Sequence, residues 1–416
     1  MMEKTPEQLC QEREKRVMDA IEMRIPDRVP IVTTFGYFPA RYCGLTFEAA
    51  WYDYDAWLAA YKRTLMDFQP DMVFVQSFFP GKVLEYLDPK QTRWPGHGVS
   101  PYHSHQAIEA ENMKADEYDA YLGDLSDYTL RFLLPRTCGV MEPFSMFPPL
   151  SSLGHNYWGT QAIAETLAIP EVAKAVETLQ KAGREMEKWR SKMVAFNEEI
   201  EKLGFPPLSG GGGGAPFDMI SDFLRGMQGA MLDMYRQPDR LLELCEKILQ
   251  DMLERAVPAA KESGIPRVFM ALHRGSDGFM SLKQFETFYW PYLKRVILAF
   301  INEGITPCIF FEGDWTARLE YLLELPKGKV LGHFDAVDIF RAKEVLKGHV
   351  CIRGNIPSSL LGTGTVEEVK DYCKKLIDVV GKDGGYIMSP RSSVDEAKPE
   401  NFKAMIDFTK EYGVYN

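Results

Sequence analysis

Short apolar runs alternate with amphipathic stretches along the second half of the chain. Similar apolar runs occur near the N-terminus. The runs that predict buried strands lie at 29–32, 71–79, 267–272, 307–311, 329–334, 349–353 and 385–388. The stretches between the later runs predict helices, and this many strand–helix units favour a single α/β domain over residues 1–416, a (β/α)8 TIM barrel. An open, doubly wound parallel sheet is the alternative fold.

Three other segments depart from this alternation. Residues 5–24 predict a charged helix with one apolar face ahead of the first strand. Residues from about 80 to 160 are rich in Pro, Tyr and His and predict an irregular insert around the barrel mouth. A helical extension from about 170 to 214 ends in the five glycines Gly210 to Gly214. We expect these glycines to form either a loop whose backbone lies close to a ligand or a flexible linker.

Charge, hydropathy and motif content argue against several classes of function. The net charge of −11 argues against nucleic acid or an anionic membrane as the main partner. No apolar run approaches the roughly 20 residues that span a bilayer, and the N-terminus lacks the apolar core of a signal peptide, so we expect a cytoplasmic protein. The seven cysteines are scattered, as in reduced structural thiols. Motifs of dinucleotide-binding folds, P-loops and nucleophile elbows are absent.

Polar side chains follow the predicted strands at the point where each strand ends. They are Gln76, His273, Asp277, Glu312, Asp314, His333, Asp335, Asn355, Ser389 and Arg391. In a barrel these side chains converge, because successive strand ends surround one mouth. Their mixture of nitrogen and oxygen donors suits zinc, and Glu312 and His333 on adjacent strands are the first candidate ligands.

The remaining ligands of such a metal site are open. The candidates for the third ligand are His273, Asp277, Asp314 and Asp335. A Glu312–His333 hydrogen-bonded pair without metal is the alternative. His103 and His105 also have the spacing of a metal-binding pair, but their position in a polar loop favours a structural role.

Several short motifs along the chain resemble one family. They are Arg24-Ile-Pro-Asp-Arg-Val-Pro30, Pro216-Phe-Asp218, Arg353-Gly-Asn-Ile-Pro-Ser358, Gly385-Tyr-Ile-Met-Ser-Pro390 and Pro399-Glu-Asn-Phe402. With these motifs the chain resembles the uroporphyrinogen decarboxylase superfamily over nearly its whole length, most clearly over 216–416. The resemblance implies a (β/α)8 barrel, in agreement with the strand pattern. It also implies either a tetrapyrrole decarboxylase or a corrinoid-dependent methyltransferase.

Particular positions favour the methyltransferase branch. Family decarboxylases bind a polycarboxylate through an N-terminal Met-Arg-Gln-Ala-Gly-Arg segment, which residues 33–41 do not reproduce, and the mouth is short of the cations that several carboxylates need. The branch that uses coenzyme M has cysteine zinc ligands, and Glu312 stands at one of those positions. Some O-demethylase methyltransferases use a Glu-x14-Glu-x20-His zinc motif. Glu312 and His333 match its second half, whereas Ile297 stands where the first Glu would be.

The resemblance implies transfer of a methyl group from a methyl ether, such as a methoxylated aromatic, to the cobalt(I) of a corrinoid carried by a partner protein. Zinc would act as the Lewis acid on the ether oxygen, or His273 or Asp277 would donate a proton to it. The expected substrate-binding residues are Tyr37, Gln76, Phe78, Trp315, Asp335 and Asn355. The alternatives are a different methyl donor (a methylamine, methylthiol or quaternary amine) and a non-catalytic protein that binds a tetrapyrrole or a corrinoid protein.

Overall fold

The computed structural model describes residues 4–75, 78–154 and 156–415, and parallel strands form its centre. Strands β6 to β11 make one parallel sheet in chain order, and β1 pairs with β2. The bounds are β1 (Val32–Thr34), β2 (Met72–Phe74), β6 (Gly211–Gly213), β7 (Arg267–Leu272), β8 (Thr306–Phe311), β9 (Leu331–Phe334), β10 (Cys351–Arg353) and β11 (Tyr386–Ile387). The five strands predicted in the second half of the chain are therefore all present.

Two isolated parallel bridges join these sheets into a ring. Ile31 bridges to Met388 beside β11, and Val73 in β2 bridges to Pro207 ahead of β6. The amide of Val32 donates to the carbonyl of Met388 at 3.1 Å. Eight parallel strands thus follow one another around a closed circuit, which confirms the predicted (β/α)8 barrel rather than the open sheet.

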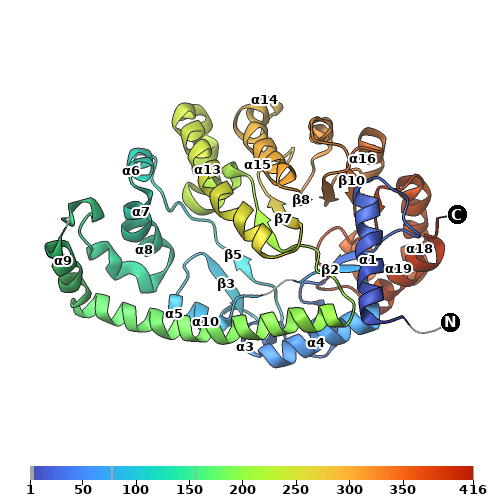
Figure 1. Cartoon of the computed structure of the whole chain (residues 1–416), viewed down its shortest axis with the longest axis horizontal. Helices are drawn as coiled ribbons and strands as arrows, with labels where there is room; N and C mark the ends of the chain where they lie inside the picture. Colours follow the sequence, from blue (N-terminus) through green and yellow to red (C-terminus); the bar gives the residue numbers. More distant parts are fainter. Residues whose placement is uncertain (1–3, 76–77, 155, 416) are drawn as a thin grey trace.

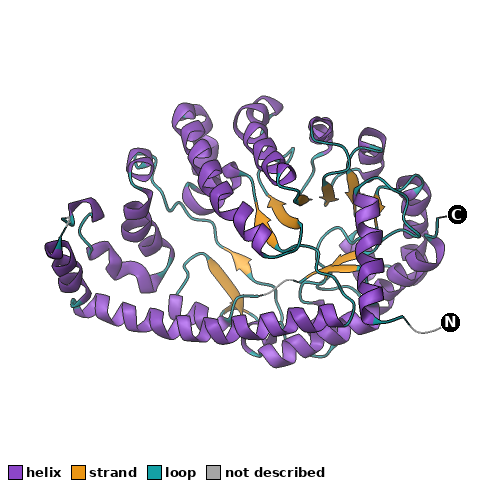
Figure 2. Ribbon diagram, viewed as in Figure 1, coloured by secondary structure: helices purple, strands orange, loops and turns teal. Residues whose placement is uncertain are grey.

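Helices surround this ring (Figure 2). The longer ones outside the barrel are α4 (Tyr54–Phe68), α13 (Pro238–Glu262), α15 (Trp290–Asn302), η6 (Thr316–Glu324), α16 (Ile339–Leu346), α18 (Val366–Leu376) and α19 (Pro399–Tyr412). Short elements at the mouth and in the connections are α2 (Phe38–Tyr42), α3 (Ala49–Tyr52), α11 (Pro216–Met219), η4 (Ile220–Leu224), α12 (Gly226–Arg236), α14 (Leu282–Gln284), η5 (Phe285–Tyr289), α17 (Ser358–Thr363) and η7 (Ile377–Gly381). None of the helices in the described residues is long and apolar enough to cross a membrane.

The N-terminal helix α1 (Pro6–Ile21) closes the end of the barrel where the strands begin. Its apolar residues Val17, Ala20 and Ile21 are fully buried against inward-facing residues of six strands. The buried Arg267 at the start of β7 forms an ion pair with Glu14 of the same helix. The opposite end of the barrel is therefore the open one, as expected for the carboxyl ends of the strands.

The glycine run is a barrel strand, so the predicted loop or linker is wrong. Strand β6 pairs with β7 in parallel, with Gly211 opposite Val268 and Gly213 opposite Met270. A Cβ atom at Gly213 would lie 3.0 Å from the ring of Phe300 in α15. A strand without side chains has no apolar alternation, which explains why the sequence pattern does not reveal it.

The insert consists of short helices, three short strands and loops. Its elements are α5 (Gly81–Leu87), β3 (Thr92–Pro95), β4 (Gly98–Val99), β5 (Gln106–Ala107), α6 (Tyr118–Gly123), α7 (Leu125–Tyr128), η1 (Thr129–Leu133), α8 (Leu134–Thr137), η2 (Gly139–Met146), η3 (Leu150–Ser152) and α9 (Tyr157–Leu167). Figure 1 shows α6 to α9 at one end of the molecule, away from the barrel. The long helix α10 (Pro170–Lys202) runs back from them to the barrel and carries the chain into β6.

Candidate active site

A histidine–glutamate pair lies at the open end of the barrel. His273 follows β7 and Glu312 follows β8, and the register places Leu272 opposite Phe311. The next residue on each strand is therefore adjacent to its counterpart, and Nδ1 of His273 lies 2.6 Å from Oε2 of Glu312. The side chains are 38% and 51% exposed, so a small molecule can reach both.

A buried carboxylate fixes the backbone beneath this pair. Asp218 of α11 accepts hydrogen bonds from the amides of His273 and Arg274, both at 2.9 Å. The hydroxyl of Tyr289 donates to the same carboxylate at 2.7 Å. Burial raises the pKa of Asp218 to about 6, against the opposing effect of these three donors. The position of the imidazole is thus set by buried contacts rather than by a free loop.

Each partner of the pair favours the charged form of the other. The hydrogen bond to Glu312 raises the pKa of His273, and the same bond lowers the pKa of Glu312. Nε2 of His273 is 3.9 Å from Oδ2 of Asp222, too far for a hydrogen bond. The protonated imidazole therefore keeps an N–H that it can donate to a ligand at the mouth.

The second predicted metal ligand lies on a lower level. His333 is opposite Phe310 in the β8–β9 register, and Phe310 lies two residues before Glu312 on β8. The ring centroids of Phe310 and His333 are 4.9 Å apart. Its Nε2 lies 3.0 Å from the carbonyl of Pro390, which can only accept, so the proton is on Nε2. Burial and the positive charge of Arg353 lower the pKa of His333 well below its ordinary value. The predicted pairing of Glu312 with His333 is therefore absent from the structure, in which Glu312 is bonded to His273.

The donor set does not fit a catalytic zinc ion. Such a site needs three protein ligands, and the described parts of the chain contain no group of three or more His, Cys, Asp or Glu residues placed to hold a metal. The positive charge of Arg353 beside His333 would also repel a second cation.

Three other predicted site residues brace the mouth. Both carboxylate oxygens of Asp277 are bonded, one to the amide of Ala317 at 3.0 Å and one to Arg318 in an ion pair. Asp335 accepts from the amide of Gly313 at 3.0 Å, and burial raises its pKa. Asn355 donates to the carbonyls of Asp335 and Val337 at 3.1 and 2.9 Å. A catalytic role for Asp277 and a substrate-binding role for Asp335 and Asn355 stay predictions.

The predicted aromatic wall is packed into the rim. Tyr37 is 1% exposed and stacks between Phe47 and Phe78, with ring centroids 4.5 and 4.3 Å away. Its hydroxyl lies 2.9 Å from Nδ1 of His105, which agrees with a structural role for that histidine. Gln76 lies outside the described residues.

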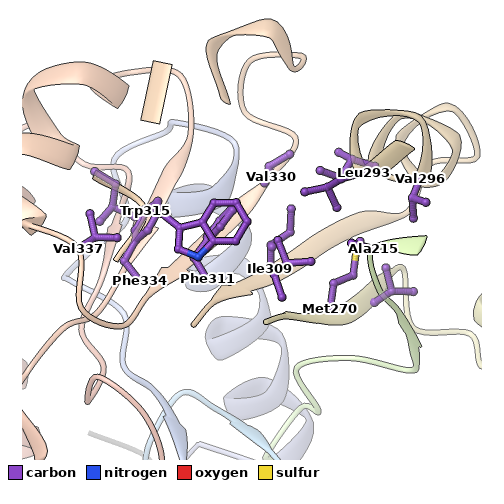
Figure 3. Close-up of a cluster of buried hydrophobic side chains, with 14 of the residues drawn as sticks. Ala215, Met270, Leu293, Val296, Ile309, Phe311, Trp315, Val330, Phe334 and Val337 are labelled. Carbon is purple, nitrogen blue, oxygen red and sulfur yellow. The ribbon is translucent and has the colours of Figure 1, made fainter. Parts of the chain in front are cut away.

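The third aromatic residue of that prediction is buried as well. Trp315 lies with Phe311 and Phe334 in the buried cluster of Figure 3 and is 2% exposed. Its indole N–H donates to the carbonyl of Glu312 at 2.9 Å. Trp315 therefore positions the catalytic candidate Glu312 from below and does not line an open pocket.

Inward-facing residues one layer below the strand ends are absent from the sequence-based prediction. Phe74, Phe269 and Phe310 are only partly buried, and the rings of Phe74 and Phe269 are 4.4 Å apart. Arg353 lies opposite His333 on β10 at the same level. The signal for them was available, because side chains two residues before a strand end point to the same face as the tip.

Comparison with known proteins adds the following findings. A family model described as "Uroporphyrinogen decarboxylase (URO-D)" matches residues 167–412. The chain is 24% identical over 270 residues to a uroporphyrinogen decarboxylase of Syntrophotalea carbinolica, covering 62% of this chain and 75% of that protein. It is 29% identical over 232 residues to one of Anaeromyxobacter dehalogenans, covering 54% and 62% of the two chains.

A solved structure supports the fold over almost the whole length. It is described as a methyltransferase from Methanosarcina mazei and is similar with a TM-score of 0.60, covering 96% of this chain and 98% of that chain. The sequence identity is 14%, so this similarity concerns the barrel and its insert rather than the chemistry.

Proposed function

The chain belongs to the uroporphyrinogen decarboxylase family, and from that premise we propose that it is a methyltransferase. It takes a methyl group from a methyl ether, such as a methoxylated aromatic, and passes it to the cobalt(I) of a corrinoid on a partner protein. The observation that carries the proposal is the His273–Glu312 pair at the open end of the barrel, with an N–H free to donate to a ligand. The fold shared with a methyltransferase agrees with it.

Decarboxylation of a tetrapyrrole has less support. A substrate with many carboxylates needs several free cations, but Arg274 at this mouth is bonded to Asp222 at 2.9 Å and Arg391 lies 3.5 Å from Asp335. The pair of His273 and Glu312 suits one developing negative charge on a leaving oxygen better than a polyanion.

The corrinoid supplies the cobalt(I) that accepts the methyl group, and the residues of this chain act on the other product. As the bond between the methyl carbon and the ether oxygen breaks, both bonding electrons remain on the oxygen. The protonated His273 donates its Nε2 proton to that oxygen, so the leaving group departs as an alcohol or phenol. Glu312 holds the imidazole in orientation through Nδ1 and stabilises its charge.

The partner has to approach the open end of the barrel. Glu312 is half-exposed there, whereas α1 fills the opposite end. A corrinoid protein that docks over the strand ends therefore reaches a methyl group held beside His273.

The proposal is tested with the purified protein, a chemically reduced cobalt(I) corrinoid and a panel of methoxylated aromatics. Formation of methylated corrinoid is followed by absorbance, and the demethylated phenol by chromatography. We expect both products in equal amounts. Methyl transfer from methylamines, methylthiols or quaternary amines but not from ethers would show that the donor is not a methyl ether. Methyl transfer from none of these compounds would favour a non-catalytic binding protein.

Metal analysis tests the zinc assignment separately. We expect Glu312→Ala and His333→Ala to keep the zinc content of the wild type, because the two side chains lie on different levels and have other partners. Plasma mass spectrometry after incubation with zinc measures it. About one zinc per wild-type chain, lost from both variants, would contradict this expectation and restore the predicted ligand pair.

A further inference from the structure

A buried arginine inside the barrel has no acidic partner in the part of the chain that the structure describes. Arg353 is 1% exposed and shares an inward face with Cys351, which packs against α1 at the closed end. Its guanidinium donates from Nε to the hydroxyl of Ser389 at 3.1 Å and from Nη2 to that of Thr34 at 3.2 Å. These two bonds leave three of its five N–H groups without a hydrogen-bond partner among the described residues.

The charge of Arg353 is uncompensated in the described residues. None of their carboxylates forms an ion pair with it, whereas the other fully buried arginine of the strands, Arg267, is bound to Glu14. The thiol of Cys308 would raise the pKa of Arg353 if it lost its proton, but burial raises the pKa of that thiol to about 11. Burial also lowers the pKa of Arg353 to about 10, which leaves it charged at neutral pH.

An uncompensated buried cation is costly unless an anion joins it. Neutral His333 beside it adds no charge of its own. The hydroxyls of Thr34 and Ser389 flank the guanidinium and can turn toward an anion. A planar guanidinium favours a carboxylate because two N–H groups can bind its two oxygens.

Aromatic side chains share the inward faces of the strands with Arg353. Phe74, Phe269 and Phe310 come from β2, β7 and β8 and are only partly buried. They offer apolar faces to a ring, while Arg353 offers the charge. An aromatic ring with a carboxylate matches both features.

The acid and the guanidinium face each other across the interior. Arg353 is on β10 and His273 follows β7, three strands away in a ring of eight. The strands of the barrel are tilted, and the register climbs towards the mouth from β10 to β7, so Arg353 lies deeper than its register partner Ala271, and His273 lies nearer the mouth still. A ligand held at Arg353 therefore extends upward and across toward His273.

We propose that Arg353 binds the carboxylate of the methyl donor, and that the donor is a methoxylated aromatic carboxylic acid with the carboxylate deep in the barrel and the ether oxygen at His273. This inference rests on the proposed function for the reaction. Binding of the carboxylate can be measured without any methyl transfer.

The experiment compares 4-methoxybenzoate and 3-methoxybenzoate with the corresponding neutral benzamides by isothermal titration calorimetry. We expect the wild type to bind at least one benzoate about 30-fold or more tightly than its amide, and Arg353→Gln to lose that preference. Arg391→Gln is the matched control, because it removes an arginine at the same mouth that is 37% exposed, and it should keep the preference. Arg353→Lys should retain part of it, since it keeps the charge without the planar fork.

Thermal unfolding separates this role from a structural one. A buried arginine that binds an anion destabilises the ligand-free protein, because its charge is then unpaired. Arg353→Met should therefore unfold at the same temperature as the wild type or at a higher one. Equal binding of benzoate and benzamide by the wild type would overturn the inference even if the variants fail to fold. Competition by inorganic phosphate as strong as by benzoate would overturn the aromatic class. Benzoate binding without methyl transfer would leave this site standing and count against the proposed reaction alone.

Discussion

His273→Gln is expected to lower the rate of methyl transfer by about 10²- to 10⁴-fold while leaving the folded structure intact. The size follows from the usual contribution of a positioned proton donor, here to an alkoxide or phenolate leaving group. The side chain is 38% exposed, and its one hydrogen bond to the described residues joins Nδ1 to Glu312 at 2.6 Å, so its loss leaves no buried cavity. Single-turnover kinetics with a cobalt(I) corrinoid measures the effect, and circular dichroism checks the fold.

The pH dependence identifies the acid. Because the bond to Glu312 raises the pKa of His273, the protonated form persists to higher pH than in an isolated histidine. Without Glu312 that pKa falls, so in Glu312→Gln the rate should start to decline at a lower pH than in the wild type. Asp277→Asn is the comparison variant. Because Asp277 forms an ion pair with Arg318, this substitution should lower the stability of the protein without shifting the pH–rate profile. A shifted profile in Asp277→Asn and an unchanged one in Glu312→Gln would assign the proton to Asp277.

Gly275→Ala is expected to destabilise the protein by about 3 kcal/mol and to reduce activity with it. A Cβ atom at Gly275 would lie 2.2 Å from the ring of Trp315 and 2.5 Å from that of Tyr289. Both rings are buried and anchored, the indole on the carbonyl of Glu312 and the hydroxyl on Asp218. Neither ring can move without displacing a group that positions His273.

The same loop provides the matched control. Gly278 has no atom within 4 Å of a built Cβ, so Gly278→Ala should unfold within about a degree of the wild type. Differential scanning calorimetry and the methyl-transfer rate give the two readouts. If Gly275→Ala is as stable as the wild type, the rings of Trp315 and Tyr289 have room to shift, and the packing under His273 is not tight.

The strands of the second half were predictable because helices cover one face and the barrel interior the other, so each strand reads as a short apolar run. Runs such as 267–272 and 307–311 carry this pattern and coincide closely with β7 and β8. Strand β6 was not predictable in the same way, since glycine gives no pattern and its role depends on pairing with β7. Backbone hydrogen bonds with a distant segment decide its structure.

The site was only partly predictable, because strand ends are defined by register. The sequence suggests that Glu312 and His333 both end their strands, but β9 continues to Phe334 and places His333 opposite Phe310. The pairing of Glu312 with His273 depends on a neighbouring strand 39 residues away in the chain. Aromatic residues next to the tips, such as Trp315, are needed to fill the rim, so their chemical type alone does not mark a pocket.

The glycine strand sets how much space the barrel has for a guest. The built Cβ at Gly211 approaches Ala260 of α13. Among the described residues, that at Gly212 meets no side chain within 4 Å, and that at Gly214 meets no atom within 4 Å. The interior of such a barrel is filled by layers of side chains, and the four in each layer come from alternate strands. Here β6 contributes only backbone at Gly212, next to the backbone of Phe269. The glycines of β6 therefore help to determine which methyl donors fit into the barrel. Each methyl group added to β6 by a glycine-to-alanine substitution should reduce the range of ring substituents that the site accepts.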